Sequence, residues 1–288
     1  MPYHWNENLT DRSLSDALRL AQLLLRVHGD DARREAEVLL SGVLRCTRSH
    51  LYAHADQKLT LTQAVEFQAL IERRAAGEPV AYLLGTREFW SLDLAVSADT
   101  LIPRPDTELL VERALLCIPK DAALRVADLG TGSGAIALAI ARERPRCHVI
   151  ATDVSEAALA VARGNAARHG IDTVEFRSGD WCAALAGTRC AVIISNPPYI
   201  PAADPHLAKG DVRFEPRAAL TPGPDGLEAI RQIAAQAHAH LYSGGWLLLE
   251  HGYDQSAAVT GLLHDLGYRE ITASADLSGH KRVAQGRK

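Results

Sequence analysis

The sequence predicts an α/β protein in which a Rossmann-like, doubly wound sheet follows a small all-helical domain and a β-hairpin linker. Apolar residues recur at helical spacing as far as about residue 77, and segments of helical and strand character alternate from residue 106 onward. The 288 residues are 47% hydrophobic and 23% charged, which is typical of a soluble globular protein long enough for two domains. We therefore expect three parts: residues 1–77, 78–100 and 101–288.

The first part carries a helical pattern. Its apolar side chains lie three or four positions apart, at Leu14, Leu18, Ala21, Leu25, Ala36, Leu39, Leu40, Val43, Leu44, Val65, Leu70 and Ile71. Helix starts are predicted at Asp30–Asp31 and at Thr60 or Thr62, and helix ends at Gly29 and Gly77. These signals predict a bundle of short helices.

The second part breaks this pattern. Glu78–Pro79 ends the last helix, and residues 80–96 then mix aromatic and β-branched side chains around Gly85 and Ser91. This mixture predicts a hairpin or short strands that connect the two domains.

The third part alternates between helices and strands. The predicted order is helix 106–117, strand 124–129, helix 134–143, strand 147–152, helix 155–168, strand 173–178, strand 190–195, helix 226–240, strand 244–250 and helix 254–265. Such alternation predicts a mainly parallel sheet with helices on both faces, in which ligands bind at the carboxyl ends of the strands.

Composition limits the function classes. The formal net charge of −4 gives no basic field, so no stable nucleic-acid binding is expected, although a local basic patch stays open. The five cysteines form no C-x-x-C pair, which argues against a disulfide framework or a zinc site, and we expect no metal. Residues such as His4 and Trp5 do not form a signal-peptide pattern, and no apolar run reaches membrane-spanning length. We expect a cytoplasmic protein without membrane contact.

A glycine-rich loop lies between the first predicted strand of the sheet and the next helix. Its residues are Gly130, Thr131, Gly132, Ser133 and Gly134. Glycines allow a tight turn and close backbone approach, and the free N–H groups of the helix start favour an anionic group. The loop alone is a weak signal, because the third glycine of a dinucleotide fingerprint would fall at Ala135.

Two further strand ends favour an adenosine cofactor. Asp153 ends the next strand, roughly 20 residues beyond the first loop glycine, where an acid can accept hydrogen bonds from both ribose hydroxyls. Asp180 and Trp181 follow the third strand, where an acid can bind an adenine amino group and an indole can stack on its face. The alternatives to cofactor binding are purely structural roles: a tight turn for the glycine loop and ordinary core packing for Trp181.

The loop and a second motif together carry a family resemblance. After the apolar run 191–194 the chain reads Asn196-Pro197-Pro198-Tyr199, and with Asp128-Leu129-Gly130 through Gly134 this resembles S-adenosylmethionine-dependent methyltransferases that alkylate exocyclic or amide nitrogen. Over nearly its full length the chain resembles the peptide chain release factor N5-glutamine methyltransferases, the PrmC or HemK family. The resemblance includes the segment from Leu101 to Glu108.

The second motif suits an amide substrate. An amide nitrogen is a poor nucleophile because its lone pair is delocalised, so it must be positioned. The Asn196 side-chain carbonyl can accept one amide hydrogen and the Pro197 backbone carbonyl the other, which orients the nitrogen toward the methyl donor. Pro198 stiffens the loop, and Tyr199 can flank the flat amide. Asn196 also lies where it can contact the cofactor.

The resemblance implies methyl transfer from S-adenosyl-L-methionine, with S-adenosyl-L-homocysteine as product, to the glutamine of the Gly-Gly-Gln motif in class 1 release factors. The helical domain would then recognise the factor. Three alternatives stay open: glutamine methylation of a ribosomal protein, N-methylation of an exocyclic amino group in nucleic acid, and an adaptor that binds the cofactor without catalysis.

Other residues have weaker claims. The resemblance puts Arg104, Thr107 and Glu108 near the methionine end of the cofactor, with a helix start as the alternative role. Glu250 ends a later strand and either faces the crevice or supports it, so it is not included among the site residues. Residues 201–226 show little periodicity, and we expect either a loop that covers the site and contacts the protein substrate or a plain surface loop.

Overall fold

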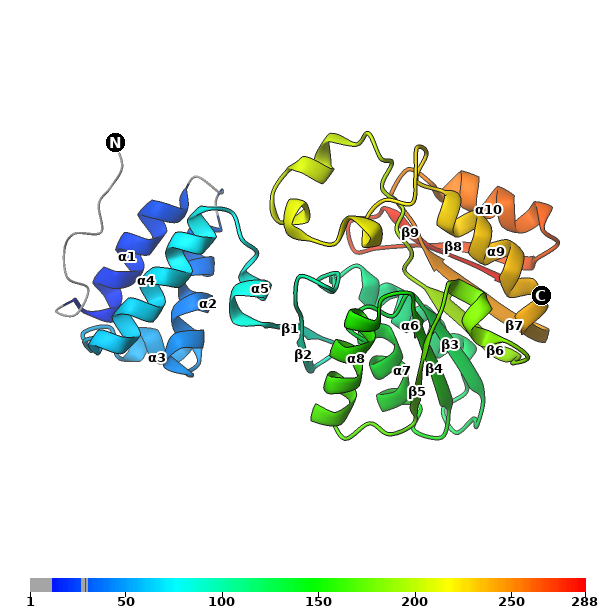
Figure 1. Ribbon diagram of the computed structural model, residues 1–288, viewed down its shortest axis with the longest axis horizontal. Coiled ribbons are helices and arrows are strands. Elements are labelled where there is room, and N and C mark those ends of the chain that lie inside the picture. The colour runs from blue at the N-terminus through cyan, green and yellow to red at the C-terminus, as the bar shows by residue number, and fades with distance from the viewer. Residues whose placement is uncertain (1–11, 27–28, 30) are drawn as a thin grey trace. The chain divides into compact units, whose positions relative to one another are not determined.

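The computed structural model (Figure 1) divides into two units of dense internal contact, one formed by residues 1–85 with 209–214 and the other by residues 86–208 with 215–288. The structure describes residues 12–26, 29 and 31–288. The sequence features noted at His4, Trp5 and Asp30 lie outside the described residues. The domain limits expected at residues 77 and 100 stay a prediction. The boundary between the two units lies between Gly85 and Thr86.

The first unit is helical, as the spacing predicts. Its helices are α1 (Leu14–Leu25), α2 (Ala32–Leu44), α3 (Arg48–Ala53), α4 (Leu61–Ala75) and α5 (Val80–Leu84). Leu14, Leu39 and Phe67 are among the side chains that fill its core. Thr60 starts α4 with a full capping box, in which its hydroxyl accepts from the Gln63 N–H and the Gln63 side chain accepts from the Thr60 N–H.

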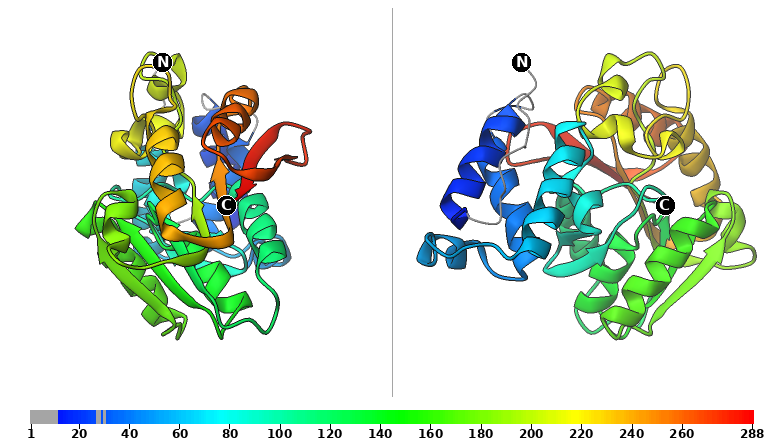
Figure 2. Two further views of the ribbon diagram at one scale, coloured as in Figure 1. Left: turned by 90° about the vertical axis from the view of Figure 1, so that its right-hand side faces the viewer. Right: turned by 60° about the vertical axis from the view of Figure 1, so that its left-hand side comes forward.

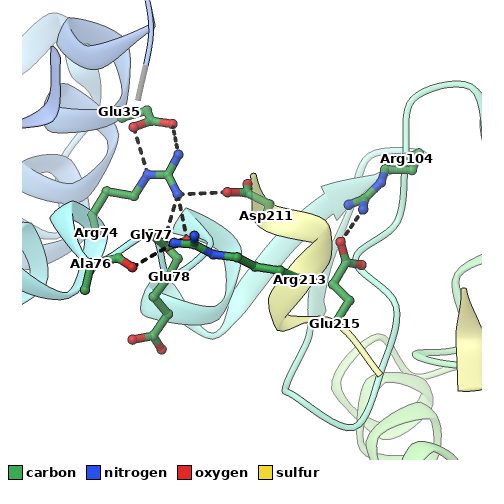
Figure 3. A network of polar contacts seen from close by, with 9 residues as sticks. All are labelled: Glu35, Arg74, Ala76, Gly77, Glu78, Arg104, Asp211, Arg213 and Glu215. Atoms are coloured by element: carbon green, nitrogen blue, oxygen red, sulfur yellow. Dashed lines mark hydrogen bonds and ion pairs between the residues drawn. The ribbon is translucent and has the colours of Figure 1, made fainter. Parts of the chain in front are cut away.

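A distant segment completes this unit. Residues 209–214, which include a 3-10 helix at Asp211–Phe214, pack with it although they follow β6 and the Asn-Pro-Pro-Tyr motif in the chain. The Arg74 guanidinium donates to Glu35 and, at 2.8 Å, to the carboxylate of Asp211, and Arg213 donates to the carbonyl of Ala76 at 2.9 Å (Figure 3). These two hydrogen bonds, from Arg74 to Asp211 and from Arg213 to Ala76, attach the segment to the helices of the unit.

The expected hairpin begins later than predicted. Residues 80–84 form the short helix α5, which ends at Gly85 with φ +71°, and the hairpin consists of β1 (Thr86–Phe89) and β2 (Leu92–Ala95). Trp90 and Ser91 make its turn with φ of 52° and 56°. Two consecutive positive φ angles give a turn whose twist matches that of the paired strands. The prediction of strand from residue 80 was wrong because a five-residue apolar run has no readable period.

The second unit is built on a seven-stranded sheet of order β5-β4-β3-β6-β7-β9-β8. Its strands are β3 (Arg125–Leu129), β4 (His148–Asp153), β5 (Val174–Ser178), β6 (Cys190–Ser195), β7 (Leu241–Glu250), β8 (Arg269–Ala275) and β9 (Lys281–Arg287). The first five run parallel, whereas β9 is antiparallel to both β7 and β8. The predicted doubly wound α/β class is confirmed.

Helices cover both faces of this sheet (Figures 1 and 2). They are α6 (Thr107–Cys117), α7 (Ala135–Glu143), α8 (Glu156–Arg168), α9 (Glu228–His240) and α10 (Ser256–Asp265), with 3-10 helices at Trp181–Leu185, Pro205–Ala208 and Arg217–Ala219. Successive strand residues point to opposite faces. Val126 accordingly packs with α6 and α7, whereas Ala127 packs with α9 and α10. Among the described residues, no helix is long and apolar enough to cross a membrane.

Candidate active site

The glycine loop follows β3 and leads into α7. Gly130, Gly132 and Gly134 have φ of +74°, +55° and +87°, a region that favours glycine. The N–H groups of Gly130 and Thr131 donate to the carbonyl of Thr152 on β4, at 2.9 and 2.8 Å. A Cβ atom at Gly130 would lie 3.0 Å from Cζ3 of Trp181, so the indole occupies the space that any side chain would need.

Asp128 braces this loop from beneath. Its buried carboxylate accepts from the Thr131 hydroxyl at 2.7 Å and from the Ala137 N–H of α7 at 3.2 Å. Burial raises the pKa of Asp128 to about 7, against the effect of these two hydrogen bonds. The loop and the start of α7 are thus held to one side chain of β3. Thr131 and Ser133 are themselves buried, with 6% and 2% of their surface exposed.

Asp153 ends β4 beside the loop. One carboxylate oxygen accepts from the Gly132 N–H and the other from the Ser155 N–H, each at 2.9 Å. A carboxylate oxygen can accept more than one hydrogen bond, so both keep capacity for a ligand. Asp180 follows β5, is exposed, and accepts from Gln232 at 2.9 Å.

Asn196 follows β6, whose last residue, Ser195, is buried and donates its hydroxyl to the carbonyl of Leu129 at 2.7 Å. This bond ties the end of β6 to the end of β3. The Asn196 side-chain nitrogen donates to the hydroxyl of Thr107, the first residue of α6, at 3.1 Å. Pro197 is buried, and Pro198 lines the cavity described below.

Tyr199 is held at both of its ends. Its hydroxyl donates to a carboxylate oxygen of Glu250, the last residue of β7, at 3.1 Å, and its backbone carbonyl accepts from Gln255 at 2.9 Å. Burial and the neighbouring Glu250 raise the pKa of Tyr199, which keeps the phenol neutral. Burial also raises the pKa of Glu250 to about 7. Glu250 therefore supports the motif rather than facing solvent.

A cavity of about 300 Å³ brings these strand ends together. Of the residues singled out in the sequence, it is lined by Gly130, Gly132, Asp153, Asp180, Trp181, Asn196 and Pro198. The other predicted site residues do not line the cavity but belong to the loops around it. Contact with a ligand stays a prediction for these residues, which are Thr131, Ser133, Gly134, Pro197 and Tyr199.

One wall of the cavity consists of residues 98–101 together with Pro216, Ala218 and Ala219 of the loop between β6 and α9. Residues 98–101 were not predicted at the site, whereas the three loop residues lie within residues 201–226, for which a loop that covers the site was one of two expectations. The buried Glu215 holds the two pieces together, because it accepts from the Ile102 N–H at 3.0 Å and pairs with Arg104 (Figure 3). In the sequence, Pro103 and Pro105 on either side of Arg104 were the only indication that this segment is rigid. Glu108 instead accepts from the Trp90 N–H of the hairpin, at 3.2 Å.

Comparisons with known proteins agree with this architecture. A family model described as the PrmC N-terminal domain matches residues 16–85, and one described as the methyltransferase small domain matches residues 105–209. A release factor glutamine methyltransferase from Xylella fastidiosa (strain Temecula1) is 55% identical over 255 residues, which cover 88% of this chain and 93% of the relative. One from Escherichia coli (strain K12) is 47% identical over 258 residues, covering 90% and 93%.

A solved methyltransferase from Pyrococcus furiosus shares the fold, with a TM-score of 0.53 at 20% identity, over 77% of this chain and 97% of that one. The match to the methyltransferase small domain, together with the open sheet and the glycine loop after β3, defines a methyltransferase. Given the identity with its curated relatives, the chain belongs to the release factor glutamine methyltransferase family, which confirms the resemblance drawn from its motifs.

The methyltransferase domain implies S-adenosylmethionine as methyl donor, and the cavity fits the adenosyl part of this molecule. Asp153 retains acceptor capacity for ribose hydroxyls, and Trp181 offers an indole next to Gly130, where the backbone carries no side chain. In the described part of the chain, no cluster of three or more histidine, cysteine or acidic side chains is arranged to hold a metal ion.

Proposed function

We propose that this protein transfers a methyl group from S-adenosylmethionine to the side-chain amide nitrogen of the glutamine in the Gly-Gly-Gln motif of class 1 release factors. The observation that carries the proposal is the position of Asn196. Its side chain lies at the carboxyl end of β6, on the cavity that also contains Gly130 and Asp153, so an amide recognised by Asn196 would meet the methyl donor.

The chain's own residues act chiefly by positioning. S-adenosylmethionine, when bound, supplies a methyl group already activated by its sulfonium. Asn196 accepts one hydrogen of the substrate amide through its side-chain oxygen, and Pro197 accepts the other through its backbone carbonyl. Holding both hydrogens selects an NH2 group and directs its lone pair toward the methyl carbon. As the new N–C bond forms, the C–S bond of the sulfonium breaks, and the alkylated nitrogen releases one of its two hydrogens as a proton to solvent. The neutral Tyr199 flanks the amide and keeps water from it.

A protein substrate is favoured over nucleic acid by charge. The net charge of −4 supplies no general attraction for phosphates, whereas a glutamine between glycines is slim enough to enter a crevice of this size. All five cysteines are free thiols, which suits a reducing cytoplasm, where release factors act during translation.

The test is a transfer assay with labelled S-adenosylmethionine in which purified release factor, ribosomal proteins and RNA compete for the methyl group. We expect one methyl on the Gly-Gly-Gln glutamine, located by peptide mass spectrometry, and resistance of the activity to nucleases. A release factor with alanine in place of that glutamine should take up no label.

Asn196→Ala is the matched enzyme control. It should still bind S-adenosylmethionine in calorimetry but transfer methyl at least roughly a hundredfold more slowly, because the amide loses its orientation. Label on ribosomal protein or RNA, with the release factor unmodified, would contradict the proposed substrate. Unchanged transfer by the variant would contradict the proposed role of Asn196.

A further inference from the structure

Asn165 of α8 is fully buried and bonds to two separate segments of the sheet unit. Its side-chain oxygen accepts from the Ala95 N–H at 2.7 Å. Its side-chain nitrogen donates to the Ala95 carbonyl at 3.0 Å and to the Ser133 carbonyl at 2.8 Å. A backbone N–H only donates and a carbonyl only accepts, so these partners fix the direction of the Asn165 amide and use both of its hydrogens.

Both segments lead directly to walls of the cofactor cavity. Ser133 belongs to the glycine loop and follows Gly132, which lines the cavity. Ala95 is the last residue of β2, three positions before the wall formed by residues 98–101. Asn165 thus joins the backbone beside one wall to the backbone beside another.

The chain between Ala95 and this wall is itself tied into a turn. The Ser97 N–H donates to the Thr100 hydroxyl at 3.2 Å, and the Thr100 N–H donates to the Ser97 carbonyl at 3.0 Å. Val96 and Thr100 are buried, with 5% and 1% of their surface exposed. A displacement of Ala95 is therefore passed on to the wall, because no loose linker lies between them.

Small side chains let α8 approach the glycine loop closely enough for these bonds. Ala158, Ala162 and Asn165 are seven and three positions apart and so lie on one face of the helix. Ala158 lines the cavity, and a Cβ atom at Gly134 would lie 3.2 Å from the Cβ of Ala162. Asn165 is the polar member of this face. Because it is 0% exposed, water is poorly placed to substitute for its hydrogen bonds.

We propose that Asn165 is a positioning residue that holds the wall at residues 98–101 against the glycine loop and so preorganises the cavity for S-adenosylmethionine. This inference deepens the proposed function and rests on it for the identity of the methyl donor. Asn165 does not line the cavity, so it acts on the cofactor through the two segments. A pocket that is already ordered costs less to bind, so Asn165 raises affinity for the cofactor and leaves the chemical step to other residues.

The test compares Asn165→Ala and Asn165→Asp with the wild-type enzyme by calorimetry with S-adenosylmethionine. Alanine removes all three hydrogen bonds. Aspartate keeps the shape and the acceptor for the Ala95 N–H, but it sets an oxygen against the two carbonyls. We expect both variants to raise the Kd by roughly tenfold or more. Their kcat at saturating cofactor should stay within about threefold of wild type, which is the opposite split from that expected for Asn196→Ala.

Tyr268→Phe is the matched control. It removes another buried hydrogen bond from a side chain to a carbonyl in the same unit, from Tyr268 to Ala234 at 2.8 Å, and Tyr268 does not line the cavity. This variant should lose stability and keep its affinity for S-adenosylmethionine. Amide hydrogen exchange in residues 96–101 and 130–134 should rise in Asn165→Ala but not in Tyr268→Phe, and bound cofactor should lower it again.

Two results would overturn the inference. One is a Kd in Asn165→Ala within about twofold of wild type, and the other is an equal loss of affinity in Tyr268→Phe. If Asn165→Ala is unfolded without ligand, thermal unfolding over a series of S-adenosylmethionine concentrations measures its affinity. Failure to fold at every concentration would assign Asn165 to the fold alone and would also contradict the proposal.

Failure of the proposed function would look different, because the calorimetry contains no release factor. In that case the wild-type enzyme would bind S-adenosylmethionine more tightly than the Asn165 variants and would still leave release factor unmodified.

Discussion

At the scale of single residues, the contact between Gly130 and Trp181 shapes the cofactor cavity. A side chain at Gly130 would meet both a left-handed φ of +74° and the indole at 3.0 Å. We expect Gly130→Ala to cost about 1–2 kcal/mol of unfolding free energy from backbone strain and to displace Trp181, which should weaken S-adenosylmethionine binding by roughly tenfold or more. Urea unfolding and calorimetry measure the two effects.

Gly170→Ala is the matched control for that substitution. Gly170 has a similar φ of +63°, but an added Cβ would meet no atom within 4 Å. Gly170→Ala should lower the free energy of unfolding through the same backbone strain but should leave the affinity for S-adenosylmethionine unchanged. If both variants lose affinity equally, the close approach of Trp181 to the glycine loop does not shape the cavity.

A second prediction at this scale concerns Asp128. Burial raises its pKa to about 7, above the ordinary value of 3.8, so between these values the folded protein binds a proton that the unfolded chain has released. Stability should therefore fall as pH rises from about 4 to 7, by at most about 1.4 kcal/mol per pH unit from this group. Asp128→Asn should flatten the slope in urea titrations at pH 5, 6 and 7. Identical slopes would contradict the proton uptake assigned to Asp128.

At the scale of elements, the segment Asp211–Phe214 is fastened to the helical unit by Arg74. The Arg74 side chain is 7% exposed and is shared between Glu35, at 20%, and Asp211, at 43%. Arg74→Gln should cost about 1–3 kcal/mol and increase amide hydrogen exchange in residues 209–214, because Asp211 loses its charged partner (Figure 3).

The adjacent Arg73→Gln is the control. Arg73 pairs with Glu78 in the same helical unit, but its side chain is 53% exposed, and a pair of this kind contributes about 1 kcal/mol or less. Exchange in residues 209–214 should not respond to it. Equal exchange in the two variants would show that Arg74 does not hold the segment.

Most elements of the sheet unit could be predicted from the sequence, because strand and helix patterns there are long and separated by turn residues. The antiparallel strands β8 and β9 were missed. Four consecutive residues of β9 are buried, but they include Gln285 and Gly286, which break both the apolar run and the alternation expected of a strand. Strand β7 starts three residues earlier than predicted because Gly244 and Gly245 read as a turn.

The site residues that lie at the carboxyl ends of the parallel strands could be predicted from the sequence. Gly130, Asp153 and Asn196 are recognisable because topology alone brings the carboxyl ends of parallel strands together. The support given to Asn196 by Thr107 and to Tyr199 by Glu250 was not predictable. Those contacts join residues far apart in the chain, and they depend on the register between β6 and β7 and on where α6 begins.

At the scale of the whole molecule, the family and the chemistry of the cavity point to one reaction. One family model matches residues 16–85 in the helical part and the other matches residues 105–209 in the sheet part, so the chain's similarity to its family extends beyond the cofactor-binding fold. We propose that the helical unit recognises the body of the release factor, since binding energy gained away from the reacting glutamine of that factor can be used to place this glutamine in the crevice.

The most direct measurement is a crystal structure of the protein with S-adenosylhomocysteine and a release factor. We predict that the glutamine amide nitrogen lies about 2.7–3.2 Å from both the Asn196 side-chain oxygen and the Pro197 carbonyl, with the Asn196 nitrogen still bonded to Thr107. A glutamine outside this reach, or an Asn196 amide turned so that its nitrogen faces the substrate, would contradict the roles proposed for Asn196 and Pro197.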